Sequence, residues 1–426
     1  MRVPGDKSIS HRALMLSALA IGESVIYGLL EGEDVLSTAA AMRAMGAHIE
    51  RGEDGAWRVH GVGVGGLLQP DAALDMGNSG TSTRLLMGLV ASHAISATFV
   101  GDASLSKRPM SRVSDPLGLM GADITASPGG RLPLMVRGAC PAVPITYTLP
   151  VASAQVKSAI LLAGLNTPGI TRVIEPVPTR DHSERMLAGF GADLTVETDA
   201  AGVRTISLRG EVDLKPQSID VPGDPSSAAF PIVAALIIPG SDVTVLNVGM
   251  NATRAGLFKV LQQMGADLTL ANERIVGGEP VADITAKHSA LKGIDIPSEV
   301  APSMIDEFPI LFVAAACATG VTRTSGLDEL RVKESDRLAL MARGLAQIGV
   351  SIEEREDGLV IHGCGGDLLP GGNQPPLIEA ALDHRIAMSF AIAGLNTKGG
   401  VLIDDMSPVA TSFPGFQAML DALRAT

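Results

Sequence analysis

The sequence has few aromatic residues, few cysteines and no long hydrophobic run. Its 426 residues include one Trp, two Tyr and three Cys. The longest apolar segments, such as FPILFVAAACATGV from Phe308, fall short of the roughly 18 uncharged residues that a membrane helix needs. Cys140, Cys317 and Cys364 are odd in number and unpatterned, which argues against a disulfide framework. These absences predict a cytoplasmic protein that does not contact a membrane.

Positive charge is also scarce. The chain has 33 Lys and Arg against 46 Asp and Glu, a formal net charge of −13. A nucleic-acid surface needs a basic face and stacking aromatics, so we expect no nucleic-acid partner. The basic residues that are present gather in short polar motifs, which suits a small polyanionic ligand. Length and a hydrophobic fraction of 46% are typical of a globular chain with two domains.

A repeated pattern runs along the chain. Val-Pro-Gly-Asp occurs at residues 3–6 and again at 221–224, each time before an apolar segment, and the internal copy argues against a signal peptide at the start. Six polar motifs each open an Ala-rich or Leu-rich helix, at Asp6, Asn78, Ser153, Asp224, Asp306 and Asp383. Between them, five helices end at a glycine before a short strand: Gly46, Gly121, Gly191, Gly265 and Gly349. The pattern predicts an α/β fold of two similar domains, each with three repeated units whose apolar helices are buried.

The polar starts of these helices are candidate anion sites. Backbone N–H groups and the helix dipole favour anions at a helix N-terminus. The first turns add polar and charged side chains: Lys7, Ser8 and Arg12; Asn78, Thr81 and Arg84; Ser153, Gln155 and Lys157; Asp383 and Arg385. The alternative is that Asp6, Asp224 and Ser226 are ordinary N-cap residues, and the sequence leaves both interpretations open.

Other motifs give no metal or nucleotide site. GVGVGG from Gly61 matches G-x-G-x-x-G, but Pro70 follows closely and no helix opens there, so it is interpreted as a turn. The sequence contains no Walker motif, and its eight histidines lack metal-ligand spacing. Asp404 and Asp405 fit the end of a strand better than a pair of ligands.

Seven segments, in order along the whole chain, resemble the signature segments of the 5-enolpyruvylshikimate-3-phosphate (EPSP) synthase family. They are PGDKSISHRALMLSALA, GNSGTSTRLLMGL, GDASLSKRPM, SAQVKSAILLAGL, IDEFPILFVAAA, ELRVKESDRL and DHRIAMSFAIAGL. Ser-Ala-Gln at 153–155 and Thr-Ser-Phe-Pro at 411–414 are similar to the class II branch. The resemblance implies the enolpyruvyl transferase fold, with six βαβαββ-type units in all. It also implies domains at 6–221 and at 222–426 plus 1–5, with the active site in the cleft between them.

The resemblance also implies an activity. Family members transfer the enolpyruvyl group from phosphoenolpyruvate to the 5-hydroxyl of shikimate 3-phosphate and release phosphate, in the shikimate pathway of aromatic amino-acid biosynthesis. It implies no metal and no organic cofactor, and we expect a monomer. The two substrates carry two phosphates and two carboxylates, which explains local basic clusters in an acidic protein. Two alternatives are a UDP-N-acetylglucosamine enolpyruvyl transferase, whose loop cysteine is absent from ASLSKRPMSR, and a non-catalytic anion-binding relative.

Transferred position by position, the family pattern implies a role for each motif residue. The residues expected to hold shikimate 3-phosphate are Lys7, Ser8, Arg12, Ser153, Ala154, Gln155 and Arg180. The residues expected around phosphoenolpyruvate are Lys7, Arg108, Lys333, Arg337 and Arg385, beside the loop of Asn78, Gly80 and Thr81. Asp306 is the expected base for the 5-hydroxyl, and Glu334 with Lys7 is expected to manage protonation of the methylene carbon. From spacing alone, Asp306 could instead stabilise a helix dipole, and Glu334 could pair with neighbours at helical spacing.

Three features depart from the family pattern or its class. The chain begins three residues before its first motif, where members carry a longer first strand, which indicates a truncated or mis-assigned start. Thr411 stands where many members have a lysine that binds phosphoenolpyruvate. Gly80 stands where glyphosate-tolerant class II members commonly carry Ala, so we expect glyphosate to compete with phosphoenolpyruvate more effectively here.

Overall fold

The computed structural model describes residues 1–366 and 368–424, and the chain divides into two units. The N-unit is Gly5–Val221, and the C-unit is Met1–Pro4 together with Pro222–Thr426. The first division falls after Pro4, whereas the sequence prediction put residue 5 in the C-unit. The backbone of Gly5 packs so closely on Gly28 that an added Cβ would lie 2.0 Å from the Gly28 carbonyl oxygen, which ties Gly5 to the N-unit.

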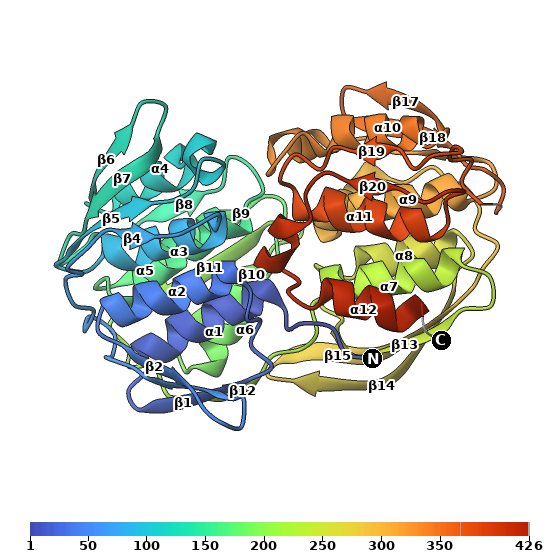
Figure 1. The fold of residues 1–426 in the computed structure, drawn as a ribbon. Coiled ribbons are helices and arrows are strands. Elements are labelled where there is room, and N and C mark those ends of the chain that lie inside the picture. Colours follow the sequence, from blue (N-terminus) through green and yellow to red (C-terminus); the bar gives the residue numbers. More distant parts are fainter. Residues whose placement is uncertain (367, 425–426) are drawn as a thin grey trace. The chain divides into compact units, whose positions relative to one another are not determined.

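The N-unit contains three successive repeats of helices and small sheets (Figure 1). Its helices are α1 (Lys7–Leu19), α2 (Glu33–Ala44), α3 (Gly80–Ala91), η1 (Leu105–Lys107), α4 (Ser111–Leu119), α5 (Ala154–Leu165) and α6 (His182–Gly189). Its strands are β1 (Glu23–Tyr27), β2 (His48–Arg51), β3 (Trp57–His60), β4 (Leu74–Asp75), β5 (Ser96–Val100), β6 (Asp123–Ser127), β7 (Arg131–Arg137), β8 (Thr146–Thr148), β9 (Ile170–Glu175), β10 (Asp193–Thr198), β11 (Arg204–Arg209) and β12 (Ser218–Asp220). They form three four-stranded sheets in the orders β12-β1-β3-β2, β4-β5-β7-β6 and β10-β11-β9-β8.

The C-unit repeats the plan with fewer strands. Its helices are α7 (Pro225–Ile237), α8 (Gly256–Gln263), η2 (Ser298–Ser303), η3 (Ile305–Glu307), α9 (Phe308–Cys317), η4 (Asp328–Val332), α10 (Arg337–Gln347), α11 (His384–Leu395), η5 (Ser407–Thr411) and α12 (Phe416–Arg424). Its strands are β13 (Asp242–Gly249), β14 (Asp267–Val276), β15 (Glu279–Lys287), β16 (Val321–Arg323), β17 (Ser351–Arg355), β18 (Gly358–His362), β19 (Leu377–Ile378) and β20 (Leu402–Ile403). Their sheet orders are β13-β15-β14, β16-β18-β17 and β19-β20.

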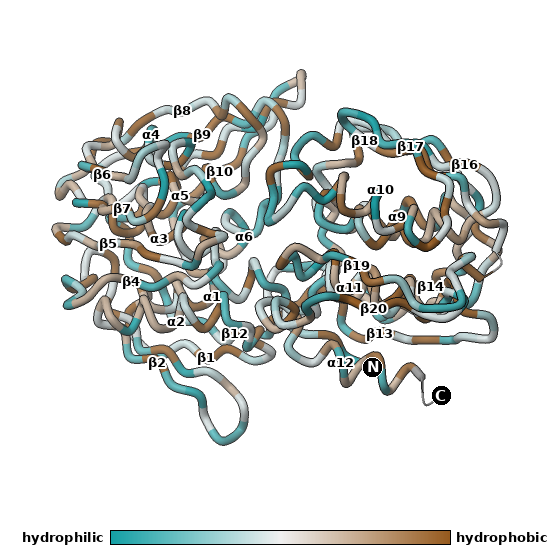
Figure 2. The backbone as a smooth tube through the Cα atoms, turned by 45° about the horizontal axis from the view of Figure 1, so that its top comes forward, coloured by the Kyte–Doolittle hydropathy of each residue, from teal (hydrophilic) through white to brown (hydrophobic). Residues whose placement is uncertain are grey.

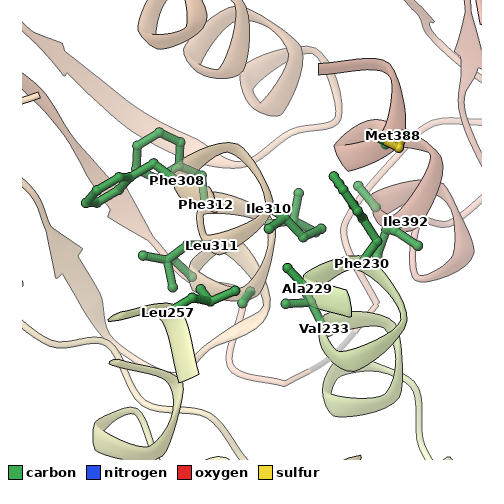
Figure 3. Close-up of a cluster of buried hydrophobic side chains, with 14 of the residues drawn as sticks. Ala229, Phe230, Val233, Leu257, Phe308, Ile310, Leu311, Phe312, Met388 and Ile392 are labelled. Atoms are coloured by element: carbon green, nitrogen blue, oxygen red, sulfur yellow. The ribbon is translucent and has the colours of Figure 1, made fainter. Parts of the chain in front are cut away.

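Three helices in each unit form the hydrophobic core, as the sequence predicts. In the C-unit every residue of α7 and of α9 is buried, and the tube of α9 is coloured as hydrophobic in Figure 2. Figure 3 shows side chains of α7, α9 and α11, among them Phe230, Ile310 and Ile392, directed toward one another. In the N-unit, α1, α3 and α5 are similarly buried. A helix without an exposed face can meet solvent or ligand only at its ends, so the polar N-termini are its accessible part.

The local signals that defined the repeats are borne out. Asp6, Ser153, Asp224 and Asp383 are the N-caps of α1, α5, α7 and α11. The helix-ending glycines have positive φ, for example +101° at Gly46, a conformation that favours glycine over residues with a Cβ. No helix in the described part of the chain is long and apolar enough to cross a membrane.

One expected helical arrangement is wrong. The alternative for Glu334 assumed helical spacing to its basic neighbours in RVKESDRL, but α10 begins only at Arg337. The reason is Asp336, whose Oδ1 accepts a hydrogen bond from Ala339 N at 3.0 Å and caps the helix at that point. Lys333 and Glu334 therefore lie in the irregular segment between η4 and α10.

Candidate active site

In the N-unit, Arg12 of α1 joins its own helix to α5 and α6. Its Nε donates to Ser183 Oγ on α6 at 2.8 Å, and its Nη2 donates to Ser158 Oγ on α5 at 2.7 Å. Its Nη1 donates to the carbonyl oxygen of Ser8 in its own helix at 2.9 Å. The guanidinium is buried and fixed in direction, so Arg12 is a preorganised cation beside the start of α1.

Lys7, the first residue of α1, forms an ion pair with Asp34 of α2. The Asp34 side chain is buried, and that of Lys7 is about a fifth exposed. The ammonium group is therefore held in place and also accessible to a ligand. The sequence analysis did not find Asp34, which follows Lys7 by 27 residues and belongs to no polar helix-start motif.

A second group of polar side chains joins α3 to α5. Gln155 Oε1 accepts a hydrogen bond from Arg84 Nη1 at 2.8 Å, and Gln155 Nε2 donates to Thr81 Oγ1 at 3.1 Å. Arg108 Nη2 donates to Asn78 Oδ1 at 2.6 Å, just before α3 begins. These hydrogen bonds place the start of α3 beside the start of α5.

Lys157 is a correction to the sequence analysis, which offered it as a first-turn cation for a ligand. Its side chain is completely buried, and its Nζ lies 2.7 Å from Glu184 Oε1 and 3.0 Å from Glu175 Oε1. Because α5 is buried on nearly all sides, residue 157 faces the interior rather than the exposed end of the helix. Lys157 therefore ties α5 to α6 and β9.

Other predicted N-unit residues lie in the same helix starts. Ser153 caps α5 through Val156 N, which donates to Ser153 Oγ at 3.4 Å, and Ala154 is the first residue of that helix. Gly80 is the first residue of α3. Arg180 is half-buried and lies two residues before α6.

In the C-unit, Arg337 gathers three carboxylates. Its Nε donates to Asp383 Oδ2 at 2.8 Å, its Nη1 to Asp306 Oδ1 at 3.3 Å, and its Nη2 to Glu334 Oε2 at 2.5 Å. Burial disfavours the charge of this guanidinium, but Asp383, Glu334 and Asp306 outweigh burial and raise the pKa of Arg337. Arg337 is 1% exposed, so it organises the carboxylates from the interior.

The same region holds the other predicted C-unit residues. Arg385 Nη1 donates to the Asp306 carbonyl oxygen at 3.0 Å and lies 3.6 Å from Glu307 Oε1. Lys333 Nζ lies 3.8 Å from Asp306 Oδ1. The pairing of Glu334 with a neighbouring basic side chain, left open by the sequence, is present. Glu307, the neighbour of Asp306 in η3, is buried and accepts a hydrogen bond from Ser226.

The two units offer different chemistry. The described N-unit residues supply cations and hydroxyl or amide groups at helix starts, a set that suits phosphate and carboxylate ligands. The C-unit residues supply carboxylates that an arginine holds in place. A carboxyl group can take part in proton transfer, whereas the guanidinium stays charged. Among the residues that the structure describes, no group of three or more His, Cys, Asp or Glu could hold a metal ion.

Comparison with known proteins identifies the family. A family model described as EPSP synthase (3-phosphoshikimate 1-carboxyvinyltransferase) matches residues 1–420. The chain belongs to the EPSP synthase family. The 3-phosphoshikimate 1-carboxyvinyltransferase of Sphingopyxis alaskensis is 72% identical to it, and the alignment covers 99% of this chain and 95% of that protein. The corresponding protein of Zymomonas mobilis is 67% identical, with coverage of 100% and 94%.

Solved structures confirm the predicted fold. An EPSP synthase from Acinetobacter baumannii superposes with a TM-score of 0.88 at 50% identity, covering 99% of this chain and 95% of that one. The enolpyruvyl transferase NikO of Streptomyces tendae, at 19% identity and a TM-score of 0.78, covers 99% of this chain and 94% of its own and agrees in fold. The enolpyruvyl transferase fold of this EPSP synthase family member is therefore as the sequence predicted.

Proposed function

We infer that this chain transfers the enolpyruvyl group from phosphoenolpyruvate to the 5-hydroxyl of shikimate 3-phosphate and releases phosphate. The observation that carries the inference is the convergence of α1, α3 and α5 in the N-unit, where Lys7 and Arg12 are held by buried partners. Such fixed cations lose little entropy when they bind an anion. Membership of the EPSP synthase family supports this choice of substrates.

We propose that the N-unit holds shikimate 3-phosphate. Arg12, Ser153 and Gln155 bind its phosphate and ring, with Lys7 and Arg180 completing the subsite. Three residues border the phosphoenolpyruvate subsite: Arg108, which donates to Asn78, Asn78 itself, and Thr81, which accepts a hydrogen bond from Gln155. The charge of each bound anion is then met by charge-assisted hydrogen bonds.

We propose that carboxylates of the C-unit take the leading part in the proton transfers, with Lys7 of the N-unit assisting. Asp306 accepts the proton of the 5-hydroxyl while that oxygen bonds to C2 of phosphoenolpyruvate, and the methylene carbon gains a proton from the Glu334 and Lys7 pair. The resulting tetrahedral intermediate loses phosphate, and the methyl group returns a proton as the double bond forms again. Lys333, Arg337 and Arg385 offset negative charge at this site.

The existing hydrogen bonds of Arg337 limit how it can bind a substrate. Its three donor nitrogens already contact Asp306, Glu334 and Asp383. A guanidinium has five N–H groups, and Nη2 also donates to Asp383 Oδ1 at 3.4 Å, so a two-point contact with the carboxylate of phosphoenolpyruvate requires Arg337 to give up one of these bonds. Asp306 belongs to the C-unit and Lys7 to the N-unit, so the reaction as proposed requires groups from both units.

Phosphate release tests the proposed function. The purified chain should release phosphate only when shikimate 3-phosphate and phosphoenolpyruvate are both present. No release across neutral pH would reject the transferase, and binding of both anions without release would identify a non-catalytic relative. UDP-N-acetylglucosamine in place of shikimate 3-phosphate should give no release. Light scattering of the same sample tests the expected monomer, and a cytoplasmic location stays a prediction.

A further inference from the structure

A buried chain of polar side chains joins α1 to the start of α3. The ring of His11 lies on α1 and is completely buried. His11 Nδ1 is 2.8 Å from Thr38 Oγ1 on α2, and Thr38 Oγ1 is 2.7 Å from Ser82 Oγ on α3. Each of these three side chains is buried. Hydrogen bonds therefore connect three helices through the interior of the N-unit.

The chain ends at the loop assigned to phosphoenolpyruvate. Ser82 Oγ is 2.7 Å from Ser79 Oγ, and Ser82 N donates to Ser79 Oγ at 3.1 Å, which makes Ser79 the N-cap of α3. Ser79 lies between Asn78 and Gly80. A change in the position of Ser79 would therefore move both neighbours.

The direction of the hydrogens follows from the carbonyl oxygen of Asp34. Ser82 Oγ donates to this oxygen at 3.1 Å, and a carbonyl can only accept. Thr38 Oγ1 also lies 3.5 Å from this oxygen, but the Ser82 contact is shorter, so we assign Thr38 as the donor to Ser82 and His11 Nδ1–H as the donor to Thr38. This assignment leaves His11 Nε2 without a hydrogen, in keeping with the absence of a hydrogen-bond partner for Nε2 among the described residues.

The charge of the ring is compatible with this arrangement. Burial is the main reason that the pKa of His11 lies well below its usual 6.5, and the positive charges of Lys7 and Arg12 lower it further. The ring is therefore neutral at neutral pH. It can connect the two helices without adding a positive charge between Lys7 and Arg12.

We propose that His11 is a positioning residue that holds the Asn78–Thr81 loop in place relative to Lys7 and Arg12. It thereby couples the two substrate subsites of the N-unit through Thr38, Ser82 and Ser79. This rests on the proposed function. His11 acts through its neighbours and touches neither substrate.

Kinetics of matched variants test the proposal. His11→Leu and Thr38→Val should each raise KM for phosphoenolpyruvate by roughly three- to tenfold, the effect of losing one hydrogen bond, with a smaller change in kcat. The double variant should be no worse than the more affected single variant, because one chain is broken in each case. His11→Asn, which keeps a polar atom near the Nδ1 position, should recover most of the loss. His93→Leu is the control, because His93 is also buried and its ring bonds to Leu89 O at the other end of α3.

The outcomes separate this proposal from the proposed function. If the parent turns over and His11→Leu lowers thermal stability while leaving KM for phosphoenolpyruvate unchanged, the coupling is rejected and the function stands. If the parent shows no turnover, the proposed transferase function is rejected. Amide hydrogen exchange in the ligand-free protein then tests the coupling by His11. The Ser82 amide should then exchange roughly three- to tenfold faster in His11→Leu than in the parent and in His93→Leu. Equal exchange would overturn the coupling.

Discussion

The two Val-Pro-Gly-Asp copies have the same backbone role and different side-chain chemistry. Asp6 Oδ1 accepts a hydrogen bond from Ile9 N at 2.9 Å, and Asp224 Oδ1 accepts one from Ser226 N at 2.7 Å. Both aspartates are therefore N-caps, whereas Ser226, the third residue of that alternative, lies inside α7 and donates a hydrogen bond to Glu307. The repeat specifies how a buried helix begins, and the residues after it decide whether that start binds a ligand.

The residues after each cap show the difference. The first copy continues with Lys7 and reaches Arg12, and both are held by side chains from other helices. The second copy continues with Pro225, and its cation comes from outside the helix: Arg254 Nη2 lies 3.2 Å from Asp224 Oδ1. The α1 copy therefore carries cations within its own helix, whereas the cation beside the α7 copy is Arg254 from another segment. The proposed function needs the first arrangement for a ligand and gives the second only a structural role. The same division of labour separates the cation-rich N-unit site from the carboxylate-rich C-unit site.

The largest expected effect comes from a C-unit carboxylate. Glu334→Gln keeps the size of the side chain but removes the ionisable group. If Glu334 takes part in proton transfer, kcat should fall by about 10²–10⁴-fold with little change in KM for shikimate 3-phosphate. Glu329→Gln is the matched control, since Glu329 pairs with Lys333 but its side chain is half exposed. If only KM for shikimate 3-phosphate rises, Glu334 contributes to substrate binding and not to proton transfer.

The two caps should differ in their effect on stability. Asp6→Ala should lower the free energy of unfolding by about 0.5–2 kcal/mol, the usual loss for an N-cap. Asp224→Ala also removes the buried carboxylate beside Arg254, so a loss of about 3–5 kcal/mol is expected. Chemical denaturation of both variants measures the difference, with Asp6→Asn and Asp224→Asn as controls that retain a capping side chain. Equal losses would show that Arg254 does not distinguish the copies.

Arg12 tests the binding side of the comparison. Arg12→Ala removes charge-assisted hydrogen bonds, so KM for shikimate 3-phosphate should rise by about 10- to 100-fold while kcat changes less. Arg209→Ala serves as the control, because Arg209 forms an exposed ion pair with Asp193 in the same unit. An unchanged KM in Arg12→Ala would remove Arg12 from the binding site.

Gly80 tests the subsite at the start of α3. A Cβ added at Gly80 would lie 2.9 Å from Arg84 Nη1 and 3.4 Å from Arg108 Nη1, so a methyl group would have to displace these side chains. Gly80→Ala should weaken glyphosate inhibition by about 10- to 200-fold, with a smaller rise in KM for phosphoenolpyruvate. Inhibition constants of parent and variant give the answer. Equal inhibition would assign glyphosate sensitivity to other pocket residues.

The smallest expected effect is the pH dependence of stability caused by His11. Because its pKa is lowered in the folded state, the unfolded chain binds the proton more readily, and stability should fall as pH drops below about 6.5. The slope from this group is at most about 1.4 kcal/mol per pH unit. The charged groups near the ring are Lys7 and Arg12 of α1 and, through its ion pair with Lys7, Asp34 of α2. Calorimetry between pH 5 and 7 should show a shallower slope for His11→Asn, and identical slopes would contradict the lowered pKa.

The helix starts could be predicted from the sequence because their signals are local. Caps such as Asp6 and glycines such as Gly46 act within a few residues of their own position. Partners such as Ser183, which holds Arg12 from 171 positions away, could not be found, because no local pattern encodes that contact. Lys157 was misinterpreted for the same reason, since its carboxylate partners are supplied by β9 and α6.

The most direct test of the division of labour is phosphate release by Arg12→Ala and Glu334→Gln with both substrates at saturating concentration. If the N-unit binds and the C-unit does the chemistry, high substrate concentration should bring Arg12→Ala to within about tenfold of the parent, while Glu334→Gln should stay about 10²–10⁴-fold slower. The opposite result, with Glu334→Gln restored by substrate and Arg12→Ala not, would contradict the account.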